Sequence, residues 1–176
     1  MATDACNAVR LHGKKGFKIF GVFGTPYHCA SSDGDDWDSV LAKQAGFESI
    51  GSHDFVDVNS CVFDLKHKCG SSAIPHGRHT AVAKERLWNQ LWGDGQPQAN
   101  VILRGHVHFH NFCGGPGWIA MTLPALQGAG SKFGARQCSG TVDYGITVFD
   151  VDSKGQFDWT CDTVQFEAQQ ATAVKA

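Results

Sequence analysis

Hydrophobic and polar positions follow two repeating patterns along the chain, and the first of them predicts strands. Residues 17–23 form a short apolar run, rich in β-branched and aromatic types, that a Gly-Thr-Pro turn ends. Residues 54–66 contain two alternating segments around Asn59 and Ser60, a pattern that favours a two-residue hairpin. Further strands are expected at 100–104, 118–123, 143–151 and 156–166.

The second pattern has the helical period. Apolar positions between residues 37 and 45 fall on one stripe, which predicts a helix over about 34–45 that Gly46 ends. Between Thr80 and Trp92 the apolar residues again recur at helical spacing, with Thr80 as the expected cap. Trp88 and Trp92 lie on this second stripe, so both are expected in the core.

The order of these elements indicates the fold class. Strands and helices alternate early in the chain and strands follow one another late, which predicts a layered α/β fold built on a sheet. A chain of 176 residues is long enough for one domain. We expect that domain over residues 1–166, followed by a polar tail at 167–176.

Composition and charge exclude several classes of protein. A net charge of −2 and a pI near 6.5 exclude a generally basic nucleic-acid or membrane-surface protein. No apolar run approaches the roughly 18 residues of a membrane span. The seven cysteines are scattered with no Cys-x-x-Cys pair, which favours reduced thiols. We therefore expect a soluble cytoplasmic protein.

The sharpest local motif follows the strand predicted at 100–104. Arg104-Gly105-His106-Val107-His108 carries two histidines two residues apart. In an extended segment residues i and i+2 point the same way, about 6.6 Å apart, so both imidazoles can face one small volume. Imidazole is a common ligand of Zn, Mn, Fe and Ni, and two such ions can hold the attacking and leaving oxygens of a phosphoryl transfer.

Together with two other motifs, this histidine pair resembles the calcineurin-like metallophosphoesterases, and more narrowly their phage and prophage branch. The resemblance covers about residues 17–150 and rests on Gly24-Thr25-Pro26-Tyr27-His28, on the strand 62–66 that leads to His67, and on Gly105-His106-Val107-His108. It implies a metallophosphoesterase-like sheet sandwich with flanking helices. It also implies a metal-dependent phosphodiesterase or phosphatase with two divalent ions (Mn, Zn, Fe or Ni) and a phosphoester substrate, a nucleotide or nucleic acid being one candidate.

The resemblance further implies a role for each motif residue. His67 and His106 would ligate one metal ion and His108 the other, while His28 would stand over the leaving group as the general acid. Thr25 lies near the place of the family's usual Asn ligand. A neutral hydroxyl is a weaker metal ligand than an amide oxygen, so the part played by Thr25 stays open.

Three other places in the sequence that contain histidine each allow two interpretations. Gly51-Ser52-His53-Asp54 also looks like the family signature, but His53 precedes His67 by 14 residues whereas His28 precedes it by 39, and only the longer spacing has room for a helix and a hairpin. His76 and Arg78 either bind phosphate oxygens with a helix N-terminus or belong to a solvated polar loop. His110 is either a surface residue or a further ligand.

The family's first half is missing from the pattern. We find neither its Asp-x-His strand end nor its Gly-Asp-x-x-Asp turn, which supply a bridging carboxylate. Three imidazoles do not neutralise two divalent cations, so we expect little metal binding or catalysis unless that half is supplied in trans. The strand at 17–23 should also have an unpaired edge or an exposed apolar face. The alternatives are a non-catalytic metal-binding remnant and a phage accessory protein.

Overall fold

A computed structural model describes residues 17–25, 36–70, 72, 74–126 and 142–165. The described elements in chain order are β1 (Phe20–Val22), α3 (Trp37–Ala45), β2 (Ser49–Gly51), β3 (His53–Val58), β4 (Cys61–Lys66), α4 (Pro75–Leu91), β5 (Val101–Arg104), β6 (Asn111–Gly115), β7 (Trp118–Thr122), β8 (Asp143–Val151) and β9 (Phe157–Gln165). Strands and helices therefore form a mixed α/β fold, as the element order predicts.

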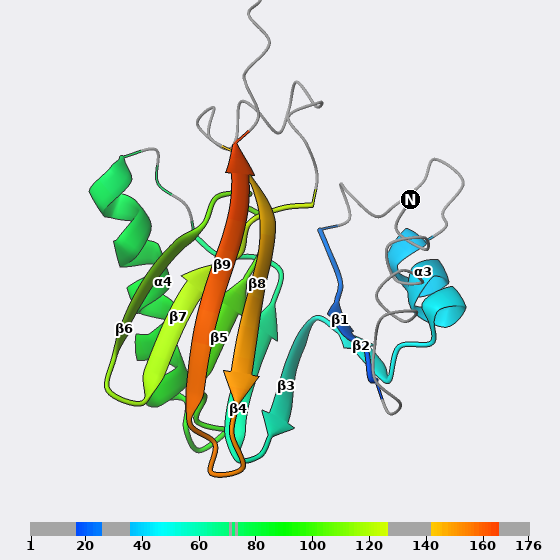
Figure 1. Ribbon diagram of the computed structural model, residues 1–176, viewed down its shortest axis with the longest axis horizontal. Coiled ribbons are helices and arrows are strands. Elements are labelled where there is room, and N and C mark those ends of the chain that lie inside the picture. The colour runs from blue at the N-terminus through cyan, green and yellow to red at the C-terminus, as the bar shows by residue number, and fades with distance from the viewer. Residues whose placement is uncertain (1–16, 26–35, 71, 73, 127–141, 166–176) are drawn as a thin grey trace, which may run out of the picture.

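A five-stranded mixed sheet lies at the centre, in the order β3-β4-β5-β7-β6 (Figure 1). The inner strands β4, β5 and β7 are parallel, while the outer strands β3 and β6 are antiparallel to their neighbours. Parallel strands end at the same edge of a sheet, and ligands of open α/β sheets bind at that carboxyl edge. The segments that follow β4 and β5 therefore lie where a site is expected.

The predicted hairpin at 54–66 is confirmed as β3 and β4. Its two turn residues, Asn59 and Ser60, have φ angles of 52° and 68°. Positive φ at both central residues is the requirement of the type I′ turn, whose twist matches that of the flanking strands. The pairing of Val58 with Cys61 closes the hairpin and fixes its register.

Two layers cover the central sheet (Figure 1). On one face Val101, Ile119 and Met121 pack against apolar side chains of the β8–β9 hairpin, among them Phe149 and Trp159. On the other face α4 contributes Val82 to a second cluster whose sheet members are Ile102 and Ala120. Side chains of successive residues point to opposite faces, so each inner strand supplies both clusters.

A smaller unit of β1, β2 and α3 lies beside this body (Figure 1). Asp36 caps α3 by accepting the N–H of Asp38, and Gly46 ends the helix with a φ of 62°. Strand β1 pairs in parallel with β2. Among the described strands it has no other partner, so its second edge is unpaired, as expected from the sequence.

Two expectations about α4 are wrong. The helix begins at Pro75, not at Thr80, because proline fits the first helical position and Ile74 serves as the cap residue without a side-chain bond. Trp88 and Trp92 are 50% and 63% exposed, because α4 turns Val82 and Asn89 toward the sheet. Strand β6, at 111–115, is a further element that the sequence pattern did not predict.

None of the helices in the described ranges is long and apolar enough to cross a membrane.

Candidate functional site

Two of the three predicted ligand histidines meet at the carboxyl edge of the sheet. His67 follows β4 directly and His106 lies two residues beyond β5, the parallel neighbour that pairs Lys66 with Arg104. The Nε2 atom of His67 lies 3.2 Å from the Nδ1 atom of His106. The two half-buried rings meet edge to face, with centroids 5.1 Å apart. Strand pairing alone therefore brings together two imidazoles that are 39 residues apart.

The backbone at His106 is strained. Its φ is 72°, and the N–H of Val107 donates to the carbonyl of Gly105 at 2.9 Å, which makes His106 the centre of a γ-turn. A non-glycine residue in such a conformation costs about 1–3 kcal/mol and persists only where its surroundings hold it. His108 also has a positive φ, of 58°. The expectation that His106 and His108 share an extended segment is therefore wrong.

The loop that carries these histidines is held on both sides. Val107 and Phe109 are 4% and 3% exposed, so they anchor the loop in the core, while His106 and His108, which alternate with them, stay half-buried. Asp143, at the start of β8, donates its N–H to the carbonyl of His108 at 2.9 Å and accepts the N–H of His110 at 2.7 Å. The surroundings thus fix the strained turn.

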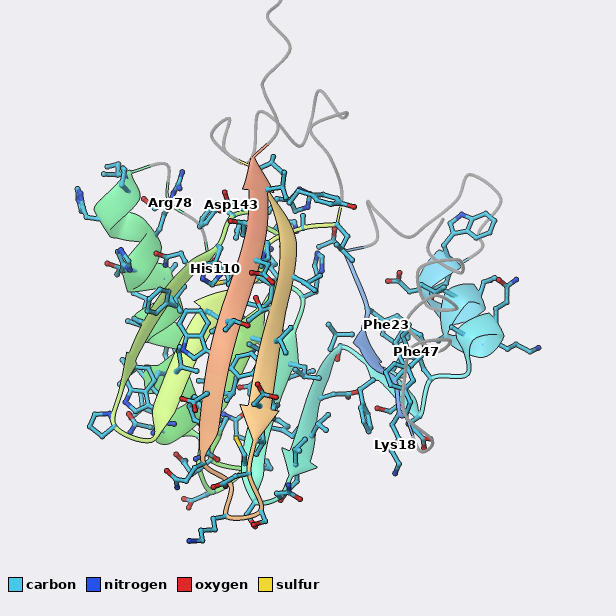
Figure 2. The ribbon with its side chains drawn as sticks, viewed as in Figure 1. Lys18, Phe23, Phe47, Arg78, His110 and Asp143 are labelled. Atoms are coloured by element: carbon cyan, nitrogen blue, oxygen red, sulfur yellow. The ribbon has the colours of Figure 1, made fainter. Side chains whose placement is uncertain are left out.

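His110 belongs to this framework. Its Nδ1 lies 3.1 Å from the carbonyl oxygen of Thr122, so Nδ1 carries the proton and donates it. The hydroxyl of Thr122 in turn donates to the carbonyl of Phe109 at 2.8 Å. Figure 2 shows Arg78, His110 and Asp143 toward the same end of the layered body. These contacts give His110 a structural role that neither sequence interpretation included.

The distance between the two imidazole nitrogens fits a shared metal ion, but the number of ligands falls short of a complete site. Two nitrogen ligands about 2.0–2.1 Å from a tetrahedral ion lie roughly 3.3 Å from each other, close to the 3.2 Å between His67 and His106. Two neutral imidazoles are nevertheless an incomplete set, because a bound ion usually has at least three protein ligands. Within the described ranges no group of three or more His, Cys, Asp or Glu side chains is placed to hold a metal ion.

The proposed acid and its neighbour Thr25 are placed only in part. His28 lies outside the described residues. Thr25 is half-buried two residues after Phe23, whose N–H donates to the carbonyl of Gly51 at 2.8 Å. Gly24 donates its N–H to the Asp38 carboxylate at 2.7 Å, which ties this segment to α3.

The expectation that the sequence lacks a Gly-Asp-x-x-Asp motif is wrong, because residues 34–38 have that spacing; its described acidic members bond to the first turn of α3 and to Gly24. Asp36 accepts the N–H of Asp38 at 3.1 Å and the hydroxyl of Ser39 at 2.6 Å. Both contacts satisfy groups of the first helical turn. Asp36 therefore acts as the helix cap, while Asp38 binds the N–H of Gly24.

His76 and Arg78 both lie in the first turns of α4, but their side chains contact different parts of the molecule. The Arg78 guanidinium stacks on the ring of Phe109, with its central carbon 4.2 Å from the ring centroid, which places it next to the histidine loop. Its buried Nε has no hydrogen-bond partner among the described residues. His76 is exposed and lines a different hollow, with Thr80 and Lys84. The structure thus brings Arg78, and not His76, to the loop.

A buried charge network lies on the α4 side of β3, β4 and β5. Arg104 binds both carboxylate oxygens of Asp64, at 2.7 and 3.1 Å, and Glu85 through Nε at 2.8 Å. Burial by itself lowers the pKa of Arg104, but hydrogen bonds and charges from Asp64 and Glu85 outweigh it, so the pKa lies above its ordinary value. Asp64 is 1% exposed, although it alternates with Phe63 and Leu65 along β4.

His53, the alternative signature histidine, belongs to this network. Its Nε2 donates to Asp64 at 2.8 Å, and its ring packs 4.7 Å from that of Phe55 on the same face of β3. The described contacts of His53 therefore stabilise a buried carboxylate.

The described cysteines are free thiols, as their scattered spacing predicts. These residues are Cys61, Cys69, Cys113 and Cys161. Burial, followed by the charge of Glu85, raises the pKa of Cys69 to about 11. Cys69 lies two residues beyond His67, but at neutral pH it is the protonated thiol, which is a poor metal ligand and nucleophile.

Comparison with known proteins gives structural likenesses alone. No protein-family model matches the sequence, and neither does any curated protein. A single mutant of Vps29 from Entamoeba histolytica has a TM-score of 0.46 at 13% identity, over 94% of this chain and 88% of that one. Wild-type Vps29 of the same organism, complexed with Zn²⁺, has a TM-score of 0.44 at 13% identity, over 85% of this chain and 98% of that one. Protein TM1076 from Thermotoga maritima has a TM-score of 0.42 at 14% identity, over 84% of this chain and 100% of that one.

Proposed function

We propose that this protein is a metal-dependent phosphoester hydrolase of the calcineurin-like type, and that His67 and His106 hold one of its divalent ions. The observation that carries the proposal is the 3.2 Å separation between the Nε2 of His67 and the Nδ1 of His106 at the ends of adjacent parallel strands. The strained turn at His106 supports it, because strain that the surroundings maintain is concentrated at functional sites.

The other motif residues take the roles that the family resemblance implies. His108 contributes to the second ion, and His28 protonates the leaving oxygen. We assign Thr25, whose role the resemblance leaves open, to substrate binding. The guanidinium of Arg78, held against Phe109, offers a fixed positive charge to phosphate oxygens, with His76 as a weaker contributor. Two divalent ions, drawn from Mn, Zn, Fe and Ni, would polarise the phosphoryl group and lower the pKa of a bound water.

The proposed pair of ions needs carboxylates in addition to the described histidines. Neutral imidazoles leave the charge of two divalent ions uncompensated, so carboxylates must come from elsewhere. We propose that a second polypeptide with the N-terminal half of the fold binds in trans. Two described sheets offer it edges, since among the described strands β1 pairs only with β2, and β8 pairs only with β9 apart from a bridge between Tyr144 and Ala125. The substrate class, a phosphodiester of a nucleotide or nucleic acid, is part of the same proposal.

A second candidate function is metal binding without catalysis. The incomplete donor set favours it, because two imidazoles can retain an ion weakly without activating water. Such a chain would be a remnant or a phage accessory protein. Hydrolysis measured with and without the complementary half separates the two candidates.

The test uses the full 176-residue chain, Mn²⁺ and bis-p-nitrophenyl phosphate. Without an added fragment, the chain should hydrolyse this substrate at a negligible rate. An added fragment that carries the Asp-x-His and Gly-Asp-x-x-Asp segments should restore turnover, which His106→Ala abolishes and His79→Ala keeps. His79 is the matched control because it is an exposed histidine bonded to the Phe112 carbonyl. Metal binding without turnover in the reconstituted pair would favour the non-catalytic candidate.

The dependence of the hydrolysis rate on the leaving group tests whether His28 is the general acid. A general acid contributes about 10² to 10⁴ in rate where the leaving oxygen needs a proton. His28→Ala should therefore slow an alkyl phosphodiester severely and a nitrophenyl ester much less, at unchanged metal content. Equal losses on the two substrates would exclude His28 as the acid.

A further inference from the structure

The outward face of α4 carries four large apolar side chains. Leu87, Trp88, Leu91 and Trp92, which we call the α4 patch, are 50%, 50%, 62% and 63% exposed. They recur at intervals of three and four residues, so they lie on one side of the helix. The opposite side is buried, with Val82 packed on the sheet and Asn89 bonded to Pro97 and Ala99. Contiguous exposed apolar surface of this kind marks an interaction site.

Two residues of the α4 patch, Trp88 and Trp92, also border a cavity whose other lining residues are polar. The indole rings of Trp88 and Trp92 are 5.8 Å apart and form one wall of a cavity of about 300 Å³. Asp64 and Arg104 line the same cavity and are saturated by each other and by Glu85. The ion pair therefore has little capacity left for a ligand, and the apolar wall above it is the part that still needs cover.

The charges beside the α4 patch are arranged to complement a second copy of it. Lys84 precedes Leu87 by three residues, and Asp94 follows Leu91 by three, in the turn after the helix. Both pairs share position 89 as their midpoint. In two antiparallel helices related by a two-fold axis through that position, Leu87 of each copy meets Leu91 of the other and Lys84 meets Asp94. Lys84 and Asp94 are both exposed.

We propose that the α4 patch is the interface of a symmetric dimer in which α4 helices of two copies pack antiparallel. One substitution then acts twice, because every contact of an isologous interface occurs in both directions. The interface is on the opposite face of the sheet from the β8–β9 hairpin (Figure 1), so the proposal is independent of the proposed catalytic partner.

The first test is sedimentation velocity of the full chain over a range of concentrations. The unaltered chain should form a dimer, and Leu91→Asp should raise the dissociation constant at least about tenfold, because it places a charge in an apolar contact. Val164→Asp is the matched control, since Val164 on β9 is 61% exposed against 62% for Leu91. A monomeric unaltered chain, or weakening by Val164→Asp alone, would overturn the proposal.

The second test exchanges charges at exposed positions that leave the fold intact. Lys84→Asp and Asp94→Lys should each weaken self-association, by roughly threefold to tenfold at low salt. An equimolar mixture of the two variants should associate again, because every facing pair is then of opposite charge. The double variant should also recover the dimer. If neither the mixture nor the double variant recovers, the antiparallel register is wrong and a different partner covers the patch.

Discussion

Asp64 and Arg104 join the parallel strands β4 and β5 through a two-point ion pair that is 1% and 2% exposed. The same strands end at the two histidines whose nitrogens lie 3.2 Å apart. Arg104 also donates to the backbone carbonyl of Asp64 at 3.1 Å. The pair therefore fixes how the strands lie beside each other and, through them, where His67 and His106 emerge.

Removing one partner of this pair should be costly. Asp64→Ala leaves the Arg104 charge buried with one carboxylate instead of two, and loss of one partner of a buried pair costs about 3–5 kcal/mol. Urea denaturation of the full chain measures the loss, with Asp162→Ala on β9 as an exposed control that should change the free energy of unfolding by at most about 0.5 kcal/mol. Equal effects of the two substitutions would show that the network contributes no stability.

The strained turn makes an unusual prediction for glycine. His106 has a φ of 72°, where glycine is free of the clash between Cβ and backbone. His106→Gly should therefore be more stable than His106→Ala, by about 1 kcal/mol in the free energy of unfolding. At His79, inside α4, the order should reverse by a similar amount, since glycine weakens a helix. The same order at both positions would mean that His106 is not strained in solution.

The buried thiol of Cys69 should make stability fall at alkaline pH. Its pKa is about 11 in the folded chain and about 8.5 in an unfolded one. The unfolded chain therefore loses its proton first, and folding stability declines as the pH rises between these two values. Below pH 8 the thiol contributes no pH dependence. The difference between the unaltered chain and Cys69→Ala in stability against pH checks this, and a constant difference up to pH 11 would contradict it.

Short-range patterns predicted much of the fold. Strand β8 has the bounds expected, 143–151, because alternation and the following turn lie within one segment. The hairpin around Asn59 and Ser60 follows from turn chemistry alone. Trp88 and Trp92 were placed in the core because the helical period shows a stripe but not which stripe meets the sheet.

The site was harder to predict because it depends on contacts between distant segments. The meeting of His67 and His106 follows from parallel pairing of β4 with β5, which the motif implied. The γ-turn at His106 depends on anchors at Asp143 and in the core, and no local signal shows them. The partnership of Asp64 with Arg104 is likewise a long-range event, although a charged residue inside an apolar strand was a visible hint.

Metal titration of histidine variants tests the central claim most directly. Zn²⁺ binding to the full chain should be measured by calorimetry for the unaltered protein, His67→Ala, His106→Ala and the double variant, with His79→Ala as control. If the two imidazoles share one ion, each single substitution should weaken binding at least about tenfold and the double should lose little more than either single. Unchanged affinity in His67→Ala or His106→Ala, or losses that add independently, would contradict a shared metal site.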